Sequence, residues 1–187
     1  MADQKVLVIC GSLRKGSYNA ALARALPALA PEGMKLIMAP PIGTFPLYNA
    51  DIQEASGFPP DAEDLATAIR GADAVLFVTP EYNWSMPGVL KNAIDWVSRM
   101  KDQPFKEKPV AIQSASQGPL GGARMQYHWR MSMTFLAAFI FGTPEVFIGL
   151  AQTKFDKDTL ELKDQPTKDA IKAQLAAFAK FIERVKA

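Results

Sequence analysis

The sequence contains little of the chemistry that builds disulfides or metal centres. Among its 187 residues there are one cysteine, Cys10, and one histidine, His128. A single cysteine excludes an internal disulfide and a Cys-x-x-Cys redox pair. A single histidine excludes a metal site built from several histidines. Any oxidation–reduction reaction carried out by this chain would therefore depend on an organic cofactor.

Excess charge and long apolar runs are also scarce. The formal net charge is +2 at pH 7, and the basic residues form no dense run of the kind that binds nucleic acid or anionic membranes. No apolar stretch approaches the roughly 20 residues that span a bilayer, and no signal peptide is expected. We expect a soluble, cytoplasmic protein with no nucleic-acid or membrane partner. Without a long polar linker, residues 1–187 are expected to form a single domain.

Two familiar phosphate-binding loops are missing as well. Gly11 and Gly16 have the spacing of a Walker loop, but Ser17 stands where that loop requires lysine, and the G-x-G-x-x-G fingerprint is absent. Residues 10–19 instead combine the end of an apolar strand, a small polar loop and the start of a helix, an arrangement that favours anion binding. The polar side chains of this loop are those of Ser12, Arg14, Lys15, Ser17 and Asn19. On its own, the segment fits a phosphate cradle and an ordinary helix cap equally well.

Apolar patterning predicts five strands that alternate with helices. Nearly continuous apolar runs are typical of parallel strands buried on both faces, and they predict strands at residues 5–10, 35–39, 72–79, 109–114 and 145–150. Apolar residues three and four positions apart predict helices after the first loop and at residues 61–70, 89–100, 123–141 and 167–186. Pro27 is expected to kink or end the first helix. Ser85 is expected to cap the helix at 89–100, with Pro87 in its first turn.

This alternation predicts an α/β fold in which a doubly wound, five-stranded parallel sheet has helices on both faces. In the flavodoxin-like strand order 2-1-3-4-5, strands one, three and four are neighbours. The loops that follow Ile9, Thr79 and Ser114 come after these strands and are rich in polar or small residues. Because ligands of open α/β sheets bind at the carboxyl ends of the strands, we expect the three loops to line one crevice.

The segment 123–141 is apolar on more than one face. A helix buried so broadly needs a partner beyond its own sheet, and the segment is rich in methionine, which is common at interaction surfaces. We therefore expect this helix to form the subunit interface of a homodimer or homotetramer. Arg124, Tyr127 and Glu145 are candidates for bonds across that interface, and His128 is expected to be structural.

Three segments together resemble the NADPH-dependent FMN reductase family. Residues 11–19 (GSLRKGSYN) are similar to that family's G-S-x-R-x-x-S-x-N loop, and residues 80–96 resemble its P-E-Y-N and P-G-x-L-K-N-A-I-D-W motifs. Residues 114–124 are similar to the family's glycine-rich third segment. The resemblance extends from the first strand to about Glu145, and within the family it points to the soluble bacterial quinone and chromate reductases.

The resemblance implies that FMN binds in the crevice. The first loop would hold its phosphate, the second would run along the isoalloxazine ring mainly through backbone groups, and the third would surround the pyrimidine end of the ring. Backbone N–H groups there would stabilise the negative charge of the reduced flavin. The residues implied for these three roles, in turn, are Ser12, Arg14, Ser17 and Asn19; Pro80, Glu81, Tyr82 and Asn83; and Ser114, Ser116, Gln117 and Gly118.

The resemblance also implies a reaction. NAD(P)H would pass a hydride to N5 of FMN and leave, and a quinone, chromate, a ferric complex or a similar acceptor would then take two electrons in a ping-pong sequence. Because FMN carries this chemistry, no catalytic side chain and no metal are assigned. NADH and NADPH both remain open as donors. Two alternative functions also remain open: a flavodoxin-type electron carrier, and a non-enzymatic regulator that uses the same fold.

Side chains near the predicted crevice also have structural interpretations. Glu81 is expected to set the loop conformation, and Asp95 to make local helix bonds, rather than to act in acid–base catalysis. Cys10 is expected to lie in the core, with a pKa that the neighbouring loop could lower. Tyr82 and Trp84 fit stacking on a substrate and simply covering the crevice equally well.

Overall fold

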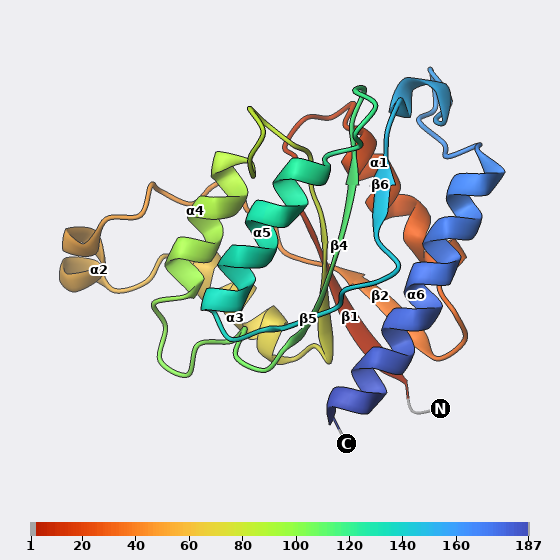
Figure 1. Ribbon diagram of the computed structural model, residues 1–187. Coiled ribbons are helices and arrows are strands. Elements are labelled where there is room, and N and C mark those ends of the chain that lie inside the picture. Colours follow the sequence, from red (N-terminus) through yellow and green to blue (C-terminus); the bar gives the residue numbers. More distant parts are fainter. Residues whose placement is uncertain (1–2, 187) are drawn as a thin grey trace.

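The computed structural model describes residues 3–186, which form a central β-sheet between two layers of helices (Figure 1). The strands are β1 (Gln4–Cys10), β2 (Met34–Met38), β3 (Ala74–Val78), β4 (Pro109–Ala115), β5 (Phe139–Ile140) and β6 (Val146–Ile148). The helices are α1 (Tyr18–Ala25), α2 (Ala50–Ser56), α3 (Pro60–Arg70), α4 (Gly88–Val97), α5 (Ala123–Phe135) and α6 (Gln165–Lys186), with the short 3-10 helices η1 (Leu26–Leu29) and η2 (Ala151–Thr153). Within this described range, no helix has both the length and the apolar character needed to cross a bilayer.

The sheet confirms the predicted strand order. Its strands follow the order β2-β1-β3-β4, with β5 and β6 beside β4, and all of these pairings are parallel. Two short strands share the last position, because β5 pairs with the start of β4 and β6 pairs with its end. The strand predicted at residues 145–150 is β6, and β5 is an additional two-residue strand that was not predicted, so the sheet of the described chain has six strands rather than five. The chain leaves the sheet at residues 141–145 and then returns to the same edge.

The two faces of the sheet build two separate cores. Val75 and Phe77 of β3 belong to the core covered by α3, α4 and α5, whereas Leu76 and Val78 belong to the core covered by α1 and α6. All five residues of β3 are buried. Burial on both faces explains why the central strands are continuous apolar runs in the sequence.

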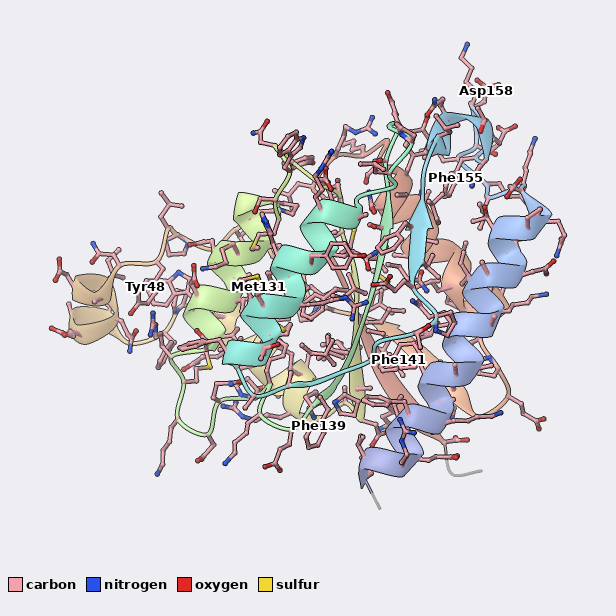
Figure 2. The ribbon with its side chains drawn as sticks, in the orientation of Figure 1. Tyr48, Met131, Phe139, Phe141, Phe155 and Asp158 are labelled. Atoms are coloured by element: carbon pink, nitrogen blue, oxygen red, sulfur yellow. The ribbon has the colours of Figure 1, made fainter. Side chains whose placement is uncertain are left out.

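The predicted 123–141 helix ends earlier than expected, at Phe135. Ala137 has a positive φ of 55°, and the next segment pairs with β4 as strand β5. Phe141, labelled in Figure 2, packs against Phe178 of α6, with ring centroids 5.5 Å apart. The apolar residues that follow α5 thus serve strand pairing and packing against α6. Apolar spacing alone does not distinguish such a short strand from a longer helix.

The end of α1 and the start of α4 test the predicted effects of Pro27 and Ser85. α1 ends at Ala25 and Pro27 lies in η1, which confirms the expected effect of that proline. α4 begins after Pro87, which occupies the N-cap position and makes no side-chain cap bond. Ser85, predicted as the N-cap, instead pairs with Tyr82 across a tight turn. That prediction is wrong because the backbone of Ser85 closes the turn three residues before the first residue of the helix, Gly88.

Candidate functional site

Three loops meet at the carboxyl-terminal edge of the sheet, at the top of the view in Figure 1. We call residues 11–17 the first loop, residues 79–87 the second loop and residues 116–122 the third loop. They follow β1, β3 and β4, which are adjacent strands. Backbone bonds join the strands up to this edge, since Gly11 donates its N–H to Val78 (3.0 Å) and Thr79 donates to Gln113 (3.1 Å). The predicted adjacency of the three loops is confirmed.

The first loop starts where the chain passes very close to the end of β3. A Cβ atom on Gly11 would lie 2.1 Å from Oγ1 of Thr79 and 2.7 Å from its Cβ. Any larger residue would therefore force β1 and β3 apart at the edge where the site begins. Glycine at this position lets the first and second loops leave the sheet side by side.

The first loop presents a row of free backbone donors. Within residues 3–186, the N–H groups of residues 12–16 have no hydrogen-bond partner. Ser17 is the N-cap of α1, and its Oγ accepts N–H bonds from Asn19 and Ala20, both at 3.2 Å. Arg14 is exposed, and no carboxylate of the described chain pairs with it. Free N–H groups, a helix N-terminus and a guanidinium together make this loop a strong anion site.

Asn19 has its side chain engaged elsewhere in the protein. It is buried, and it makes two bonds with the backbone of Ala115 at the end of β4. Nδ2 donates to the Ala115 carbonyl (2.8 Å), and Oδ1 accepts the Ala115 N–H (2.9 Å). This amide therefore ties α1 to β4. The sequence motif could not indicate the bond, because the two residues are 96 positions apart.

The second loop contains a tight turn. Tyr82 and Ser85 exchange two backbone N–H···O bonds of 2.9 and 3.0 Å. Asn83 and Trp84, between them, have positive φ angles of 50° and 64°. Tyr82, Asn83 and Trp84 are exposed. Among the residues that the structure describes, the N–H groups of Glu81 and Asn83 have no partner.

The start of the second loop is fastened to helix α5. Pro80 is buried, and the half-buried Glu81 accepts the backbone N–H of Met125 with Oε2, at 3.0 Å. Within the turn, three residues after Glu81, the ring of Trp84 lies against α5, and the Arg124 guanidinium is 4.3 Å from the ring centroid. The bond of Glu81 supports the expected role of this side chain in setting the loop conformation.

The third loop divides into a buried base and an open tip. Oγ of Ser114 donates to the carbonyl of Gly121 (2.6 Å) and accepts a bond from Nε2 of Gln126 (2.8 Å), and its side chain is buried. Ser116 is half-buried, whereas residues 117–118 are exposed. In the described chain the N–H groups of residues 117–118 have no partner. Ser114 therefore shapes the loop, and its tip offers backbone donors.

A cavity of about 270 Å³ opens between the first and second loops. Its lining includes apolar residues that the sequence motifs did not assign to the site. The lining residues are Gly11, Leu13, Arg14, Tyr82, Pro87, Gly88 and Val89. The last three follow the P-E-Y-N segment and lead into α4, so their place after a site strand was a signal that could have identified them.

Other side chains near the loops have structural partners. Asp95 accepts two bonds from Nζ of Lys91, at 2.6 and 2.8 Å, as expected for a local helix pair. Nδ1 of His128 lies 3.2 Å from Oγ of Ser85. Burial raises the pKa of the Cys10 thiol above its ordinary value, and this effect outweighs the lowering effect of the contact with the Ser12 carbonyl in the neighbouring loop. In the part of the chain that is described, no three His, Cys, Asp or Glu side chains form a group that could hold a metal ion.

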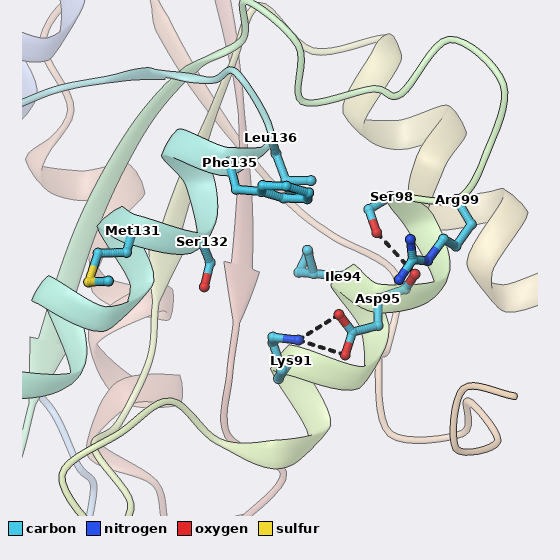
Figure 3. A pocket seen from close by; sticks show the side chains of 9 residues that line it. All are labelled: Lys91, Ile94, Asp95, Ser98, Arg99, Met131, Ser132, Phe135 and Leu136. Carbon is cyan, nitrogen blue, oxygen red and sulfur yellow. Dashed lines mark hydrogen bonds and ion pairs between the residues drawn. The ribbon is translucent and has the colours of Figure 1, made fainter.

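A larger groove of about 420 Å³ lies between α4 and α5 (Figure 3). The ion pair of Lys91 and Asp95 lies on the α4 side, and Phe135 and Leu136 lie across from it. Arg99 lines the same groove. None of the lining residues belongs to the three loops, so the groove is separate from the candidate site.

Known proteins resemble this chain over nearly its whole length. The family described as NADPH-dependent FMN reductase matches residues 4–153. The chain is 52% identical over 182 residues to the "Quinone reductase" of Escherichia coli (strain K12), with 97% of each protein covered. It is 49% identical over 184 residues to the "NAD(P)H-dependent FMN reductase PA1204" of Pseudomonas aeruginosa, with 98% of each covered.

A solved structure gives the same answer for the fold. FerB from Paracoccus denitrificans, described as a flavoenzyme NAD(P)H:(acceptor) oxidoreductase, matches with a TM-score of 0.86 and 34% sequence identity. The match covers 97% of this chain and 98% of that chain. With its strand order, its three adjacent loops and these relatives, the chain belongs to the NADPH-dependent FMN reductase family.

Proposed function

We propose that this protein binds FMN and uses NAD(P)H to reduce quinones, the activity named for its E. coli relative. The observation that carries the proposal is the set of free backbone N–H groups on three adjacent loops, with Arg14 beside them, at the carboxyl edge of the sheet. Ligands of open α/β sheets bind at this edge. We propose the cytoplasm as the place of the reaction, because NAD(P)H is available there.

The first loop suits the single phosphate of FMN. The free N–H groups of residues 12–16 and the N-terminus of α1 favour a dianion, and the Arg14 guanidinium adds a charge-assisted donor. The hydroxyl of Ser17 can donate to a phosphate oxygen while its Oγ caps α1. The Ser12 hydroxyl is a further donor in our assignment. For Asn19 we propose an indirect role in phosphate binding: its side-chain amide is bonded to the backbone of Ala115 and so fixes the position of the start of α1.

The second and third loops suit the ring system. We assign to the ring the N–H groups of Glu81 and Asn83, which have no partner in the described chain, together with those of residues 117–118. Donors of this kind can pair with ring carbonyl and nitrogen acceptors and stabilise negative charge. The exposed side chain of Tyr82 lines the cavity and would shape the edge of the ring site.

When bound, FMN would supply the chemistry, taking two electrons and a proton from NAD(P)H and giving them to the acceptor. The protein's own part is to bind, to orient and to limit access. Glu81 and Asp95 are the two carboxylates for which the sequence raises the question of acid–base catalysis. Their side chains instead make structural bonds, Glu81 to the backbone N–H of Met125 and Asp95 to the side chain of Lys91. We therefore assign no catalytic side chain.

The proposal is tested by a steady-state panel of acceptors with NADH and with NADPH. We expect purified protein to absorb near about 450 nm through its flavin and to show its highest kcat/KM with quinones, above those for chromate and ferric complexes. Protein that takes up no FMN would indicate a non-enzymatic regulator. Flavin binding without NAD(P)H oxidation would indicate an electron carrier. Either result would overturn the proposal.

We also propose that the protein forms a homodimer or homotetramer through α5. Tyr127, Met131 and Phe135 lie at successive turns of this helix, and 53%, 71% and 86% of their surfaces are exposed. Phe135 also borders the groove between α4 and α5 (Figure 3). One face thus presents both an apolar side chain and a groove, as a self-complementary two-fold interface requires. Burying this stripe would remove apolar surface from water.

Phe135→Ser is expected to shift the protein from its oligomer toward the monomer, because it deletes the most exposed aromatic side chain of the stripe. Light scattering at micromolar concentration measures the change in mass. Leu47→Ser is the matched control. Leu47 is likewise highly exposed (81%), but it lies in the segment before α2, away from the stripe on α5, so its replacement should leave the mass unchanged. A wild-type protein that is monomeric under these conditions would contradict the proposed interface.

A further inference from the structure

The second loop holds a conformation that its sequence disfavours. A two-residue turn with positive φ at both central positions normally contains Asn-Gly or Asp-Gly, because only glycine adopts such angles at no steric cost. Here Asn83 is a tolerated residue, but Trp84 has a φ of 64°. A bulky side chain in this region is an outlier that persists only where surrounding contacts hold it.

Those contacts come from the first two turns of one helix, α5. Oε2 of Glu81 accepts the N–H of Met125 at 3.0 Å, just before the turn. The Arg124 guanidinium lies over the Trp84 ring, 4.3 Å from its centroid. Nδ1 of His128 lies 3.2 Å from Oγ of Ser85 on the far side of the turn. The strained turn is thus held at its start, middle and end.

Among these contacts, the bond of Glu81 serves the helix as well as the turn. The N-cap of α5 is Gly122, which has no side chain to cap the helix, and the first turn of α5 contains no acidic residue. The N-terminal N–H groups of a helix need an acceptor and favour negative charge. Glu81 supplies both from the second loop, 44 residues away along the chain. The bond therefore couples the position of α5 to the shape of the turn.

We propose that Glu81 is a positioning residue: its carboxylate, bonded to the N-terminus of α5, holds the strained Asn83–Trp84 turn so that the N–H groups of Glu81 and Asn83 face the flavin ring. This inference rests on the proposed FMN site. It assigns to the Glu81 side chain a role at the ring end and none at the phosphate end. It also predicts that the need for the carboxylate disappears when the strain at position 84 is removed.

The test titrates flavin-free, full-length protein with FMN and with riboflavin, which has the same ring but no phosphate. Glu81→Ala is expected to weaken the binding of both flavins by about tenfold, because it loses a charge-assisted bond that shapes the ring site. Glu81→Gln keeps an oxygen acceptor for the Met125 N–H and is expected to stay within about threefold of wild type. Glu63→Ala is the matched control, since it removes an exposed acidic residue from the first turn of α3.

The decisive arm is a double-mutant cycle with Trp84→Gly, which lets the turn form without strain. In this background Glu81→Ala is expected to cost less than about threefold in affinity for either flavin. An equal cost in both backgrounds, or no cost in either, would overturn the inference. If Glu81→Ala alone does not fold, recovery of folding and flavin binding in the double variant supports the inference, and absence of recovery contradicts it. Wild-type protein that binds no flavin would instead overturn the proposed function.

Discussion

Arg14→Ala is expected to raise the dissociation constant of FMN by about ten- to a hundredfold, because a charge-assisted bond to phosphate contributes about 1.5–3 kcal/mol. The guanidinium is exposed beside free backbone N–H groups and has no carboxylate partner in the described chain. Riboflavin affinity should change little, since riboflavin has no phosphate to lose. Titration followed by quenching of flavin fluorescence measures both constants.

Two comparisons make this experiment specific. Arg24→Ala removes the same side chain from the exposed last turn of α1, and it should leave FMN affinity unchanged. Glu81→Ala, which is expected to weaken both flavins alike, separates the ring end of the site from its phosphate end. An FMN dissociation constant that is unaltered in Arg14→Ala would remove Arg14 from the phosphate site.

Trp129→Ala is expected to lower the free energy of unfolding by about 3–5 kcal/mol, the usual cost of deleting a buried aromatic side chain and leaving a cavity. Trp129 lies on α5, is fully buried, and packs edge-on against Phe77 of β3 with ring centroids 4.9 Å apart. It therefore joins the helix that holds the second loop to the centre of the sheet. Urea unfolding measures the loss, and an unchanged dependence on urea would show that the folded state keeps its compactness.

The Trp129→Phe variant is the control for volume. Nε1 of Trp129 has no hydrogen-bond partner in the described structure, so phenylalanine removes an unpaired donor while it keeps an aromatic ring. We expect this variant to lose less than about 1.5 kcal/mol. A loss as large as that of alanine would mean that the indole N–H makes a bond important to stability.

Much of the fold was predictable because its signals are local. Residues 6–9 of β1 and all of β3 are buried on both faces and therefore appear as unbroken apolar runs. Pro27 ends α1 through a property of its own ring. The rules for connecting parallel strands leave only a few possible strand orders. The adjacency of the three loops could therefore be predicted once the alternation of strands and helices was recognised.

What could not be predicted depends on partners far away in the sequence. The end of α5 at Phe135 is decided by pairing of the next segment with β4, and an apolar run fits either structure. The amide of Asn19 bonds to Ala115, and the carboxylate of Glu81 bonds to the backbone at Met125. A motif shows that such residues belong near the site, but only the folded chain shows which of their atoms remain free.

The divided outer edge of the sheet has a consequence for the protein at high concentration. A long edge strand offers a continuous row of unpaired backbone groups that other chains can extend into fibrils. Here β5 contributes two residues and β6 three, and the chain between them includes Pro144, which has no N–H to donate. A second chain that approached this edge would find no more than three residues in one register. The interruption therefore limits strand-by-strand pairing between chains at this edge of the sheet, whereas the opposite edge is the five-residue strand β2.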